Sequence, residues 1–180
     1  MSEPLSNKTI AFLATNGVEQ IELTRPWKDL QGAGATLHLV SLSPDDIDAY
    51  HHLEKAHSFP VDKVVSDEDA SHYDALILPG GVANPDALRT DRDAVAFVKH
   101  FFNSGKPVAA ICHAPWLLIE AGVVQGRTLT SFPSLQTDIV NAGGTWVDEK
   151  VHHEDGLITS RTPDDLDDFC ASLIEVLSAA

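Results

Sequence analysis

The clearest chemical feature of the sequence is the pair Cys112-His113, which directly follows an apolar run. A cysteine thiolate is a strong nucleophile, and an imidazole is a common acceptor for the thiol proton. Neighbouring side chains usually point apart, so the two can pair only where the chain turns sharply. Ala110 and Ala114, two residues before and after the cysteine, are both small, as a tight strand-to-helix turn requires. We therefore predict that Cys112 is a nucleophile on such an elbow and that His113 is its base.

The residues after the elbow favour a reactive sulfur over an inert one. A helix that begins near Pro115 would direct free amide groups and its positive end toward Cys112, which favours the thiolate. Most free cysteines are small buried apolar residues, and we expect this of Cys170, which lies beside Phe169 and Leu173 in the final amphipathic segment. We expect Cys112, in contrast, to be an exposed thiolate with a low pKa.

Paired glycines are the first candidate source of hydrogen-bond donors for the reaction. Gly80 and Gly81 follow the apolar run 75–78, and backbone amides at such a place can approach a substrate closely. Together with the amide of His113 they could hold the negative charge that develops on a carbonyl oxygen. A simple tight turn explains the same pair of glycines equally well.

Two acidic residues, Glu19 and Glu22, follow the first apolar run. In a parallel sheet their carboxylates would lie at the same edge as Cys112, where one of them could exchange a hydrogen bond with the sulfur. Acids at the start of a helix also complement the helix dipole, and spacing alone favours that simpler role.

The elements that must position these residues form an alternating pattern. Four apolar runs predict buried parallel strands, at 9–14, 36–40, 75–78 and 107–111. Helices are expected at 22–31, at 91–103 with Val95, Val98 and Phe102 as a buried stripe, and after a Thr162 hydroxyl cap near the end. Residues 43–65 suggest a loop or hairpin, and short strands are expected at 145–147, 151–153 and 157–159. The pattern predicts an α/β sandwich with a mostly parallel central sheet.

Size and charge limit the function. The 180 residues fit one domain, 1–180, and the net charge of −15 argues against nucleic acid or an anionic membrane as partner. No run approaches the roughly 20 apolar residues of a membrane span, and no secretory signal is visible, so a cytoplasmic protein is expected. The remaining histidines lack metal-ligand spacing, so we expect neither metal nor cofactor, and solvated loop histidines in the groups His51/His52/His57 and His152/His153.

Taken in order, these motifs resemble the PfpI-type branch of the DJ-one superfamily over nearly the whole chain. The matching segments are Glu19-x-x-Glu22-Leu23, Leu78-Pro79-Gly80-Gly81, Pro85-Asp86-x-Leu88-Arg89, Gly105-Lys106-Pro107-Val108, Ala110-Ile111-Cys112-His113 and Ser160-Arg161-Thr162-Pro163-Asp164-Asp165-Leu166.

This resemblance implies a three-layer, flavodoxin-like fold of the class I glutamine amidotransferase type, assembled as a homodimer or a larger ring. It implies that Cys112 is the nucleophile and that His113 is oriented by an acid from a neighbouring subunit, at the position of Asp86. It also assigns to Glu22 the carboxylate that hydrogen-bonds the cysteine, with Glu19 as a second acid.

Two functions remain open at this stage. In the first, the protein is a stress-response enzyme in which Cys112 attacks the carbonyl carbon of a peptide or a small dicarbonyl adduct, as a peptidase or a deglycase or glyoxalase. In the second, the protein is not an enzyme, and Cys112 senses oxidative stress by forming sulfenic or sulfinic acid.

Overall fold

The four predicted parallel strands form the middle of a seven-stranded sheet. The structure, a computed structural model that describes residues 3–180, places β1 (Thr9–Leu13), β3 (Thr36–Ser41), β7 (Ala75–Leu78) and β8 (Val108–Ile111) side by side. The full order is β11-β12-β8-β7-β1-β3-β6, with β6 (Lys63–Val64), β11 (Val151–Glu154) and β12 (Leu157–Ser160) completing it. Every neighbouring pair is parallel except β11 with β12.

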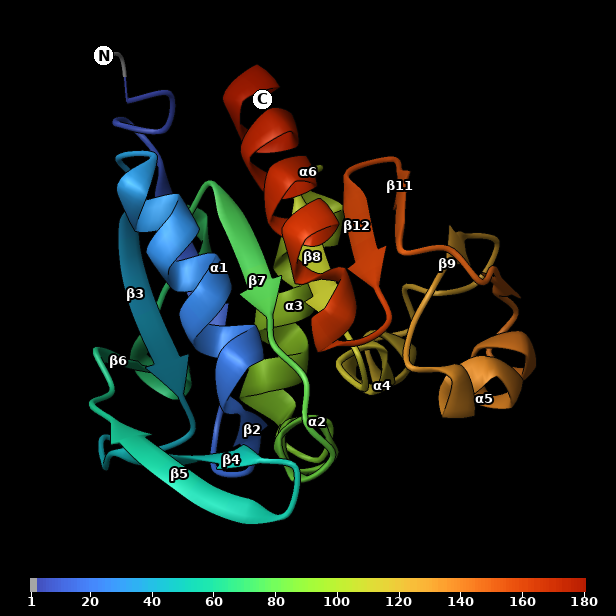
Figure 1. The fold of residues 1–180 in the computed structure, drawn as a ribbon, viewed down its shortest axis with the longest axis horizontal. Helices are drawn as coiled ribbons and strands as arrows, with labels where there is room; N and C mark the ends of the chain where they lie inside the picture. The colour runs from blue at the N-terminus through green and yellow to red at the C-terminus, as the bar shows by residue number, and fades with distance from the viewer. Residues whose placement is uncertain (1–2) are drawn as a thin grey trace.

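Alternate residues of each central strand belong to different hydrophobic cores. In β1, Ala11 and Leu13 pack with the helices α3 (Arg92–Asn103) and α4 (Pro115–Glu120), whereas Ile10 and Phe12 pack with α1 (Gln20–Gly32) and α6 (Leu166–Ala179). Strand side chains alternate in direction, so each core lies on its own face of the sheet. Figure 1 shows α1 and α6 together on one side. The predicted fold, a three-layer α/β/α sandwich with a mostly parallel sheet, is confirmed.

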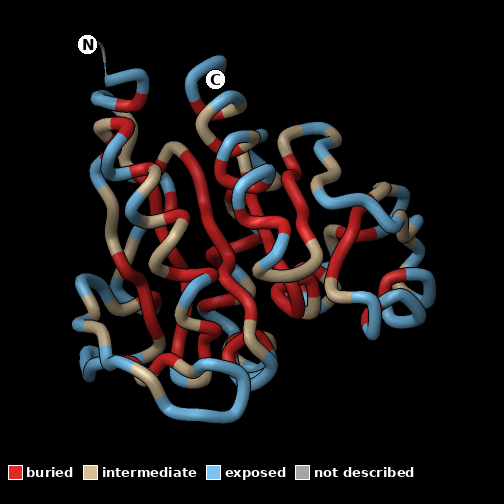
Figure 2. Tube along the Cα trace, in the orientation of Figure 1, coloured by how far each residue is buried: buried red, intermediate tan, exposed pale blue. Residues whose placement is uncertain are grey.

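Residues 43–65 contain a β-hairpin that leaves the main sheet. Strands β4 (Ile47–His51) and β5 (Glu54–Phe59) pair antiparallel, and β2 (Val18–Glu19) adds to β4 as a parallel strand. The hairpin is mostly exposed and projects along the lower edge of the molecule in Figure 2, below the carboxyl ends of the central strands. It therefore stands at the edge where α/β proteins bind ligands.

Several shorter helices, strands and turns complete the fold outside the seven-stranded sheet. They are α2 (Ala83–Leu88), α5 (Gln136–Asn141), β9 (Thr128–Leu129), β10 (Thr145–Trp146) and the 3-10 turns Val65–Asp67, Ala70–His72, Pro133–Leu135 and Pro163–Asp165. Of the three late strands predicted, β12 joins the main sheet parallel to β8, β11 pairs antiparallel to β12, and β10 pairs parallel with β9. Within residues 3–180 no helix has the length and apolar character to cross a membrane.

Two local predictions are wrong. The stripe of α3 that faces the sheet consists of Ala94, Phe97, Val98 and Phe101, so only one predicted member is buried. The large rings of Phe97 and Phe101 face the core, which leaves Val95 and Phe102 partly buried at the sides of the helix. The Thr162 side chain caps no helix, because a 3-10 turn precedes α6 and the Asp165 carboxylate accepts hydrogen bonds from Arg161 instead.

Candidate active site

Cys112 occupies a strained turn at the carboxyl end of β8. Its φ of 64° lies in the left-handed region, which costs a residue with a Cβ about 1–2 kcal/mol. Two backbone hydrogen bonds hold the turn: the Cys112 amide donates to the Ser160 carbonyl at 3.1 Å, and its carbonyl accepts from the Phe132 amide at 2.8 Å. The helix α4 begins three residues later at Pro115, so the predicted strand–elbow–helix arrangement is present.

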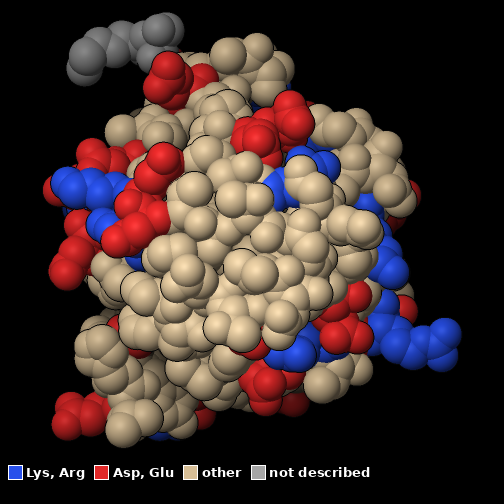
Figure 3. All heavy atoms as spheres, turned by 90° about the vertical axis from the view of Figure 1, so that its right-hand side faces the viewer, with Lys and Arg blue, Asp and Glu red and all other residues tan. Residues whose placement is uncertain are grey.

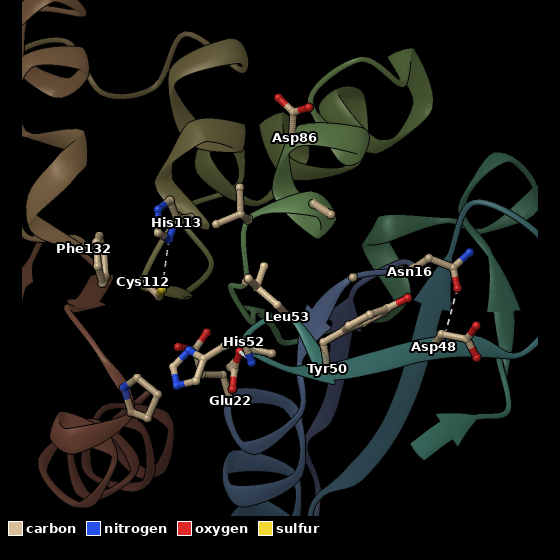
Figure 4. A pocket seen from close by; sticks show the side chains of 16 residues that line it. Asn16, Glu22, Asp48, Tyr50, His52, Leu53, Asp86, Cys112, His113 and Phe132 are labelled. Carbon is tan, nitrogen blue, oxygen red and sulfur yellow. Dashed lines mark hydrogen bonds between the residues drawn. The ribbon is translucent and has the colours of Figure 1, made fainter. Parts of the chain in front are cut away.

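The left-handed turn brings the side chains of Cys112 and His113 together. The sulfur lies 3.1 Å from His113 Nδ1, and the imidazole stacks on the Phe132 ring with centroids 4.6 Å apart (Figure 4). Burial lowers the pKa of His113, so its ring is neutral near pH 7 and can accept a proton. Its other nitrogen, Nε2, lies 3.4 Å from the Ser134 hydroxyl. Adjacency in the sequence therefore does not prevent His113 from acting as the base.

Glu22 is completely buried beside the elbow. Its Oε2 accepts a hydrogen bond from the Gly80 amide at 2.8 Å, while Oε1 has no partner among residues 3–180. Burial raises the pKa of this carboxyl to about 8, with a further contribution from the charge of Glu19, against the lowering effect of the Gly80 amide. The carboxyl is consequently protonated near pH 7, which a solvated acid at a helix start would not be.

The resting state of Cys112 differs from the exposed thiolate predicted. The residue is only 7 % exposed, and burial, followed by the charge that Glu22 carries when ionised, raises the pKa of the thiol. Hydrogen bonds from the amides of Gly81 and His113 act in the opposite direction but do not outweigh the loss of solvation. The pKa shifts and the contact between the sulfur and Nδ1 thus support a neutral thiol beside a neutral imidazole.

The glycine pair does more than form a tight turn. A Cβ on Gly80 would lie 2.5 Å from Glu22 Oε2 and 2.7 Å from the Cβ of Cys112, so only glycine lets these two side chains meet. Gly81, with a φ of 83°, directs its amide at the sulfur, as His113 does. Both amides are therefore placed to stabilise negative charge that develops at the sulfur.

The other two predicted acids do not touch the sulfur. Glu19 is buried and its Oε2 accepts a hydrogen bond from the His52 amide at 3.0 Å, which ties the hairpin to the start of α1. Asp86 lies exposed on α2 and points away from Cys112 and His113 in Figure 4. Within residues 3–180 the ring nitrogens of His113 contact Cys112 and Ser134, and the Asp86 carboxylate does not reach them.

A cavity of about 850 Å³ opens over Cys112 and holds most of these groups. The hairpin supplies Tyr50, His52 and Leu53, and Phe132 and Pro163 come from the carboxyl-terminal half. The sequence motifs assign no role at the site to Tyr50, His52, Leu53 or Phe132, because none of these residues belongs to a motif. Pro163 is part of the segment 160–166 but was given no role at the site. No group of three or more His, Cys, Asp or Glu in residues 3–180 is placed to hold a metal ion.

A cysteine on a strained elbow, after a central parallel strand and beside a buried glutamate and paired glycines, defines a class of α/β proteins with a reactive thiol. The chain belongs to the DJ-1/PfpI family, whose model matches residues 8–176. The resemblance inferred from the sequence motifs is therefore confirmed.

Proteins similar to this chain cover almost all of its length. The Bacillus subtilis (strain 168) protein named "Putative cysteine protease YraA" is 39 % identical over 171 residues, which span 95 % of this chain and 99 % of the relative. The Escherichia coli (strain K12) "Protein/nucleic acid deglycase 2" is 39 % identical over 174 residues, or 96 % and 99 %. Among solved structures, a two-domain protein of Anabaena variabilis with DJ-1/ThiJ/PfpI-like and ferritin-like domains superimposes with a TM-score of 0.91 at 32 % identity, covering 95 % of this chain and 48 % of that one.

Proposed function

We propose that the protein is a cysteine-dependent enzyme that attacks electrophilic carbonyl carbons, as a deglycase of dicarbonyl adducts or a peptidase, and protects the cell under stress. The observation that carries this is the Cys112 sulfur, 3.1 Å from a neutral imidazole and facing two backbone amides. Relatives similar over almost the whole chain are named as a protease and as a deglycase, which supports both chemistries.

The reaction would begin with transfer of the Cys112 thiol proton to His113 Nδ1 as the sulfur forms its bond to the carbonyl carbon. The carbonyl π electrons move to the oxygen, which accepts hydrogen bonds from the amides of Gly81 and His113. For a peptide, the C=O bond re-forms as the C–N bond breaks, and His113 gives the proton to the departing amine nitrogen. Water then hydrolyses the thioester left on Cys112, which releases the carboxylic acid and restores the thiol. Glu22, neutral near pH 7, adds no negative charge that would oppose the oxyanion.

Replacing Cys112 with serine tests this function. We expect Cys112→Ser to turn over methylglyoxal-modified peptides at least about a hundredfold more slowly than the wild type. The reason is that a serine hydroxyl gives up its proton to a neutral imidazole far less readily than a thiol does. The assay follows release of unmodified amine, with cleavage of an unmodified peptide measured in parallel to separate deglycase from peptidase. Cys170→Ser is the matched control, since Cys170 lies buried in α6 and should leave turnover unchanged. Equal turnover by the wild type and Cys112→Ser on both substrates would contradict the proposal.

We also propose that the active assembly is a homodimer or a larger ring, in which Asp86 of one subunit orients His113 of another. Asp86 is exposed and lines the rim of the cavity without reaching His113 in its own chain. In Figure 3 the middle of the face that carries α5, β9 and β11 is free of Lys, Arg, Asp and Glu, which gather at its rim. A neutral surface would let two chains of net charge −15 approach each other.

Mixed assemblies test the role of Asp86. We expect Asp86→Asn and Cys112→Ser to be weakly active or inactive alone, and their co-expressed mixed oligomers to recover part of the activity. Recovery occurs because one site then combines an intact Cys112-His113 pair with an intact Asp86 from the partner. Light scattering after size exclusion measures the assembly size. A monomer, or no recovery in isolated mixed oligomers, would remove the proposal.

Oxidation of Cys112 is the second candidate function, favoured by the buried Glu22 oxygen without a partner. A protonated carboxyl beside the sulfur could donate a hydrogen bond to a sulfinate. After mild peroxide, intact-protein and peptide mass spectrometry should find sulfinic acid at Cys112 and an unmodified thiol at Cys170. Oxidation of Cys170 with Cys112 left as thiol would exclude the sensor function.

A further inference from the structure

The turn at the tip of the hairpin carries a residue that its geometry disfavours. His51 pairs with Glu54, so His52 and Leu53 form a two-residue connection between β4 and β5. His52 has a φ of 56°, whereas Leu53 is not among the residues with positive φ. Positive φ at the first central residue alone is the pattern of a type II′ turn, in which that position normally belongs to glycine. His52 is therefore held in a strained conformation.

The hairpin formed by β11 and β12 has residues in its turn that favour positive φ. Between β11 and β12 the turn consists of Asp155 and Gly156, with φ values of 48° and 79°, the aspartate-glycine sequence that type I′ turns favour. That turn does not contribute to the cavity over Cys112, whereas His52 lines it. The strained residue is thus found in the hairpin that borders the site, and strain of this kind concentrates at functional positions.

The surrounding contacts fix the backbone of His52 and leave its ring unused. Its amide donates to Glu19 Oε2 at 3.0 Å, and the Gln20 side chain accepts from the His57 amide at 2.8 Å. The last residue of β2 and the first residue of α1 therefore hold both arms of the hairpin. Within residues 3–180 the His52 imidazole makes no hydrogen bond, and the residue is exposed where it lines the cavity. In the view of Figure 4, His52 and His113 flank Cys112 from opposite sides.

We propose that His52 is a substrate-binding residue that recognises the second oxygen of a dicarbonyl group. The inference rests on the proposed function, since it names a specificity residue for the dicarbonyl substrate already proposed for this site. The amides of Gly81 and His113 serve the oxygen on the carbon that Cys112 attacks. The imidazole of His52 lines the same cavity without a hydrogen-bond partner of its own, and it would donate a hydrogen bond to the oxygen on the adjacent carbon. A compound with one carbonyl oxygen makes no use of this contact.

Reversible binding of methylglyoxal and propanal to Cys112 tests the inference without requiring turnover. In each case the thiol adds to the carbonyl: the C–S bond forms, the C=O π bond breaks, and the thiol proton ends on the oxygen. The dissociation constants follow from protection of Cys112 against alkylation by iodoacetamide, and thermal unfolding gives the stability. His52→Gly is the principal variant, because glycine removes both the ring and the strain. His51→Ala, one residue away and outside the cavity lining, is the control.

We expect His52→Gly to weaken methylglyoxal binding about tenfold, the value of one lost hydrogen bond, and to leave propanal binding within about twofold. The same substitution should raise Tm by about 3 °C, since the turn position favours glycine. A purely structural role would lower stability and both affinities together. Unchanged methylglyoxal binding, equal weakening for both compounds, or a lowered Tm overturns the inference. If wild type binds methylglyoxal in this manner but turns over no adduct, the enzymatic proposal fails and the assignment of His52 stands.

Discussion

Gly80→Ala is expected to destabilise the protein by about 3 kcal/mol or more, at the upper end of the range for an overpacked core. The added Cβ would meet Glu22 Oε2 at 2.5 Å, the Cys112 Cβ at 2.7 Å and the Ile111 carbonyl oxygen at 2.7 Å. Two of these three neighbours belong to the buried elbow, so they cannot move aside without disturbing the hydrogen bonds that hold it. The carboxyl of Glu22 would also lose its 2.8 Å bond from the Gly80 amide.

Urea denaturation measures this loss, and the rate of iodoacetamide alkylation reports the state of the thiol. Gly32→Ala is the matched control: it lies at the end of α1, and a Cβ there would meet nothing within 4 Å. Because alanine is the better helix former, this control should be neutral or stabilise by up to about 1 kcal/mol. If Gly80→Ala were as stable as the wild type with an unchanged alkylation rate, the close approach of Glu22 and Cys112 across Gly80 would be wrong.

The second large effect is the dependence of stability on pH that Glu22 produces. Its pKa rises from 4.5 to about 8 on folding, so the native state binds a proton that the unfolded state releases throughout this interval. Stability from this group is therefore fully present below 4.5 and is lost as the pH rises toward about 8. Within the interval the free energy of unfolding falls by about 1.4 kcal/mol for each pH unit.

Glu22→Gln removes this ionisation while keeping an oxygen acceptor for the Gly80 amide. Urea denaturation at several pH values gives the unfolding free energy of the wild type and of Glu22→Gln. We expect the wild type to lose stability relative to the variant as the pH rises. At alkaline pH the variant should be the more stable protein. Glu19→Gln is an informative second variant, since the Glu19 charge helps to raise the pKa of Glu22. In this variant the loss of stability with rising pH should be complete at a lower pH than in the wild type. Parallel stability curves for wild type and Glu22→Gln would mean that Glu22 is ionised in the folded protein.

The four central strands could be predicted because each is a nearly continuous apolar run. The edge strand β6 could not, because it has only two residues and lies in the segment assigned to a loop or hairpin. The elbow at Cys112 could also be located, because the small residues Ala110 and Ala114 on its two sides are what a tight strand-to-helix turn requires. The protonation state of Cys112 could not be predicted in the same way. Helix position argued for a low pKa, but the opposing desolvation depends on how Glu22, Gly80 and the loop at Phe132 close over the sulfur.

Other parts of the site depended on contacts between distant segments. Glu19 and Glu22 are three residues apart and chemically identical, yet one holds the hairpin and the other lies against Gly80. The role of Thr162 was misassigned because a hydroxyl before a proline has the same sequence pattern whether it caps a helix or precedes a 3-10 turn. His52 carried no sequence signal, since strain is visible only in the backbone.

The hydrogen bonds that hold the elbow also determine when, during synthesis of the chain, the turn at Cys112 can be stabilised. The left-handed turn at Cys112 is held from outside by the Phe132 amide and the Ser160 carbonyl, both of which follow it in the chain. A nascent polypeptide that has emerged only as far as β8 therefore lacks both of these hydrogen-bond partners. Both hydrogen bonds can be present only after β12 has left the ribosome and joined the sheet, so a chain truncated before β12 lacks the Ser160 contact that holds the strained turn.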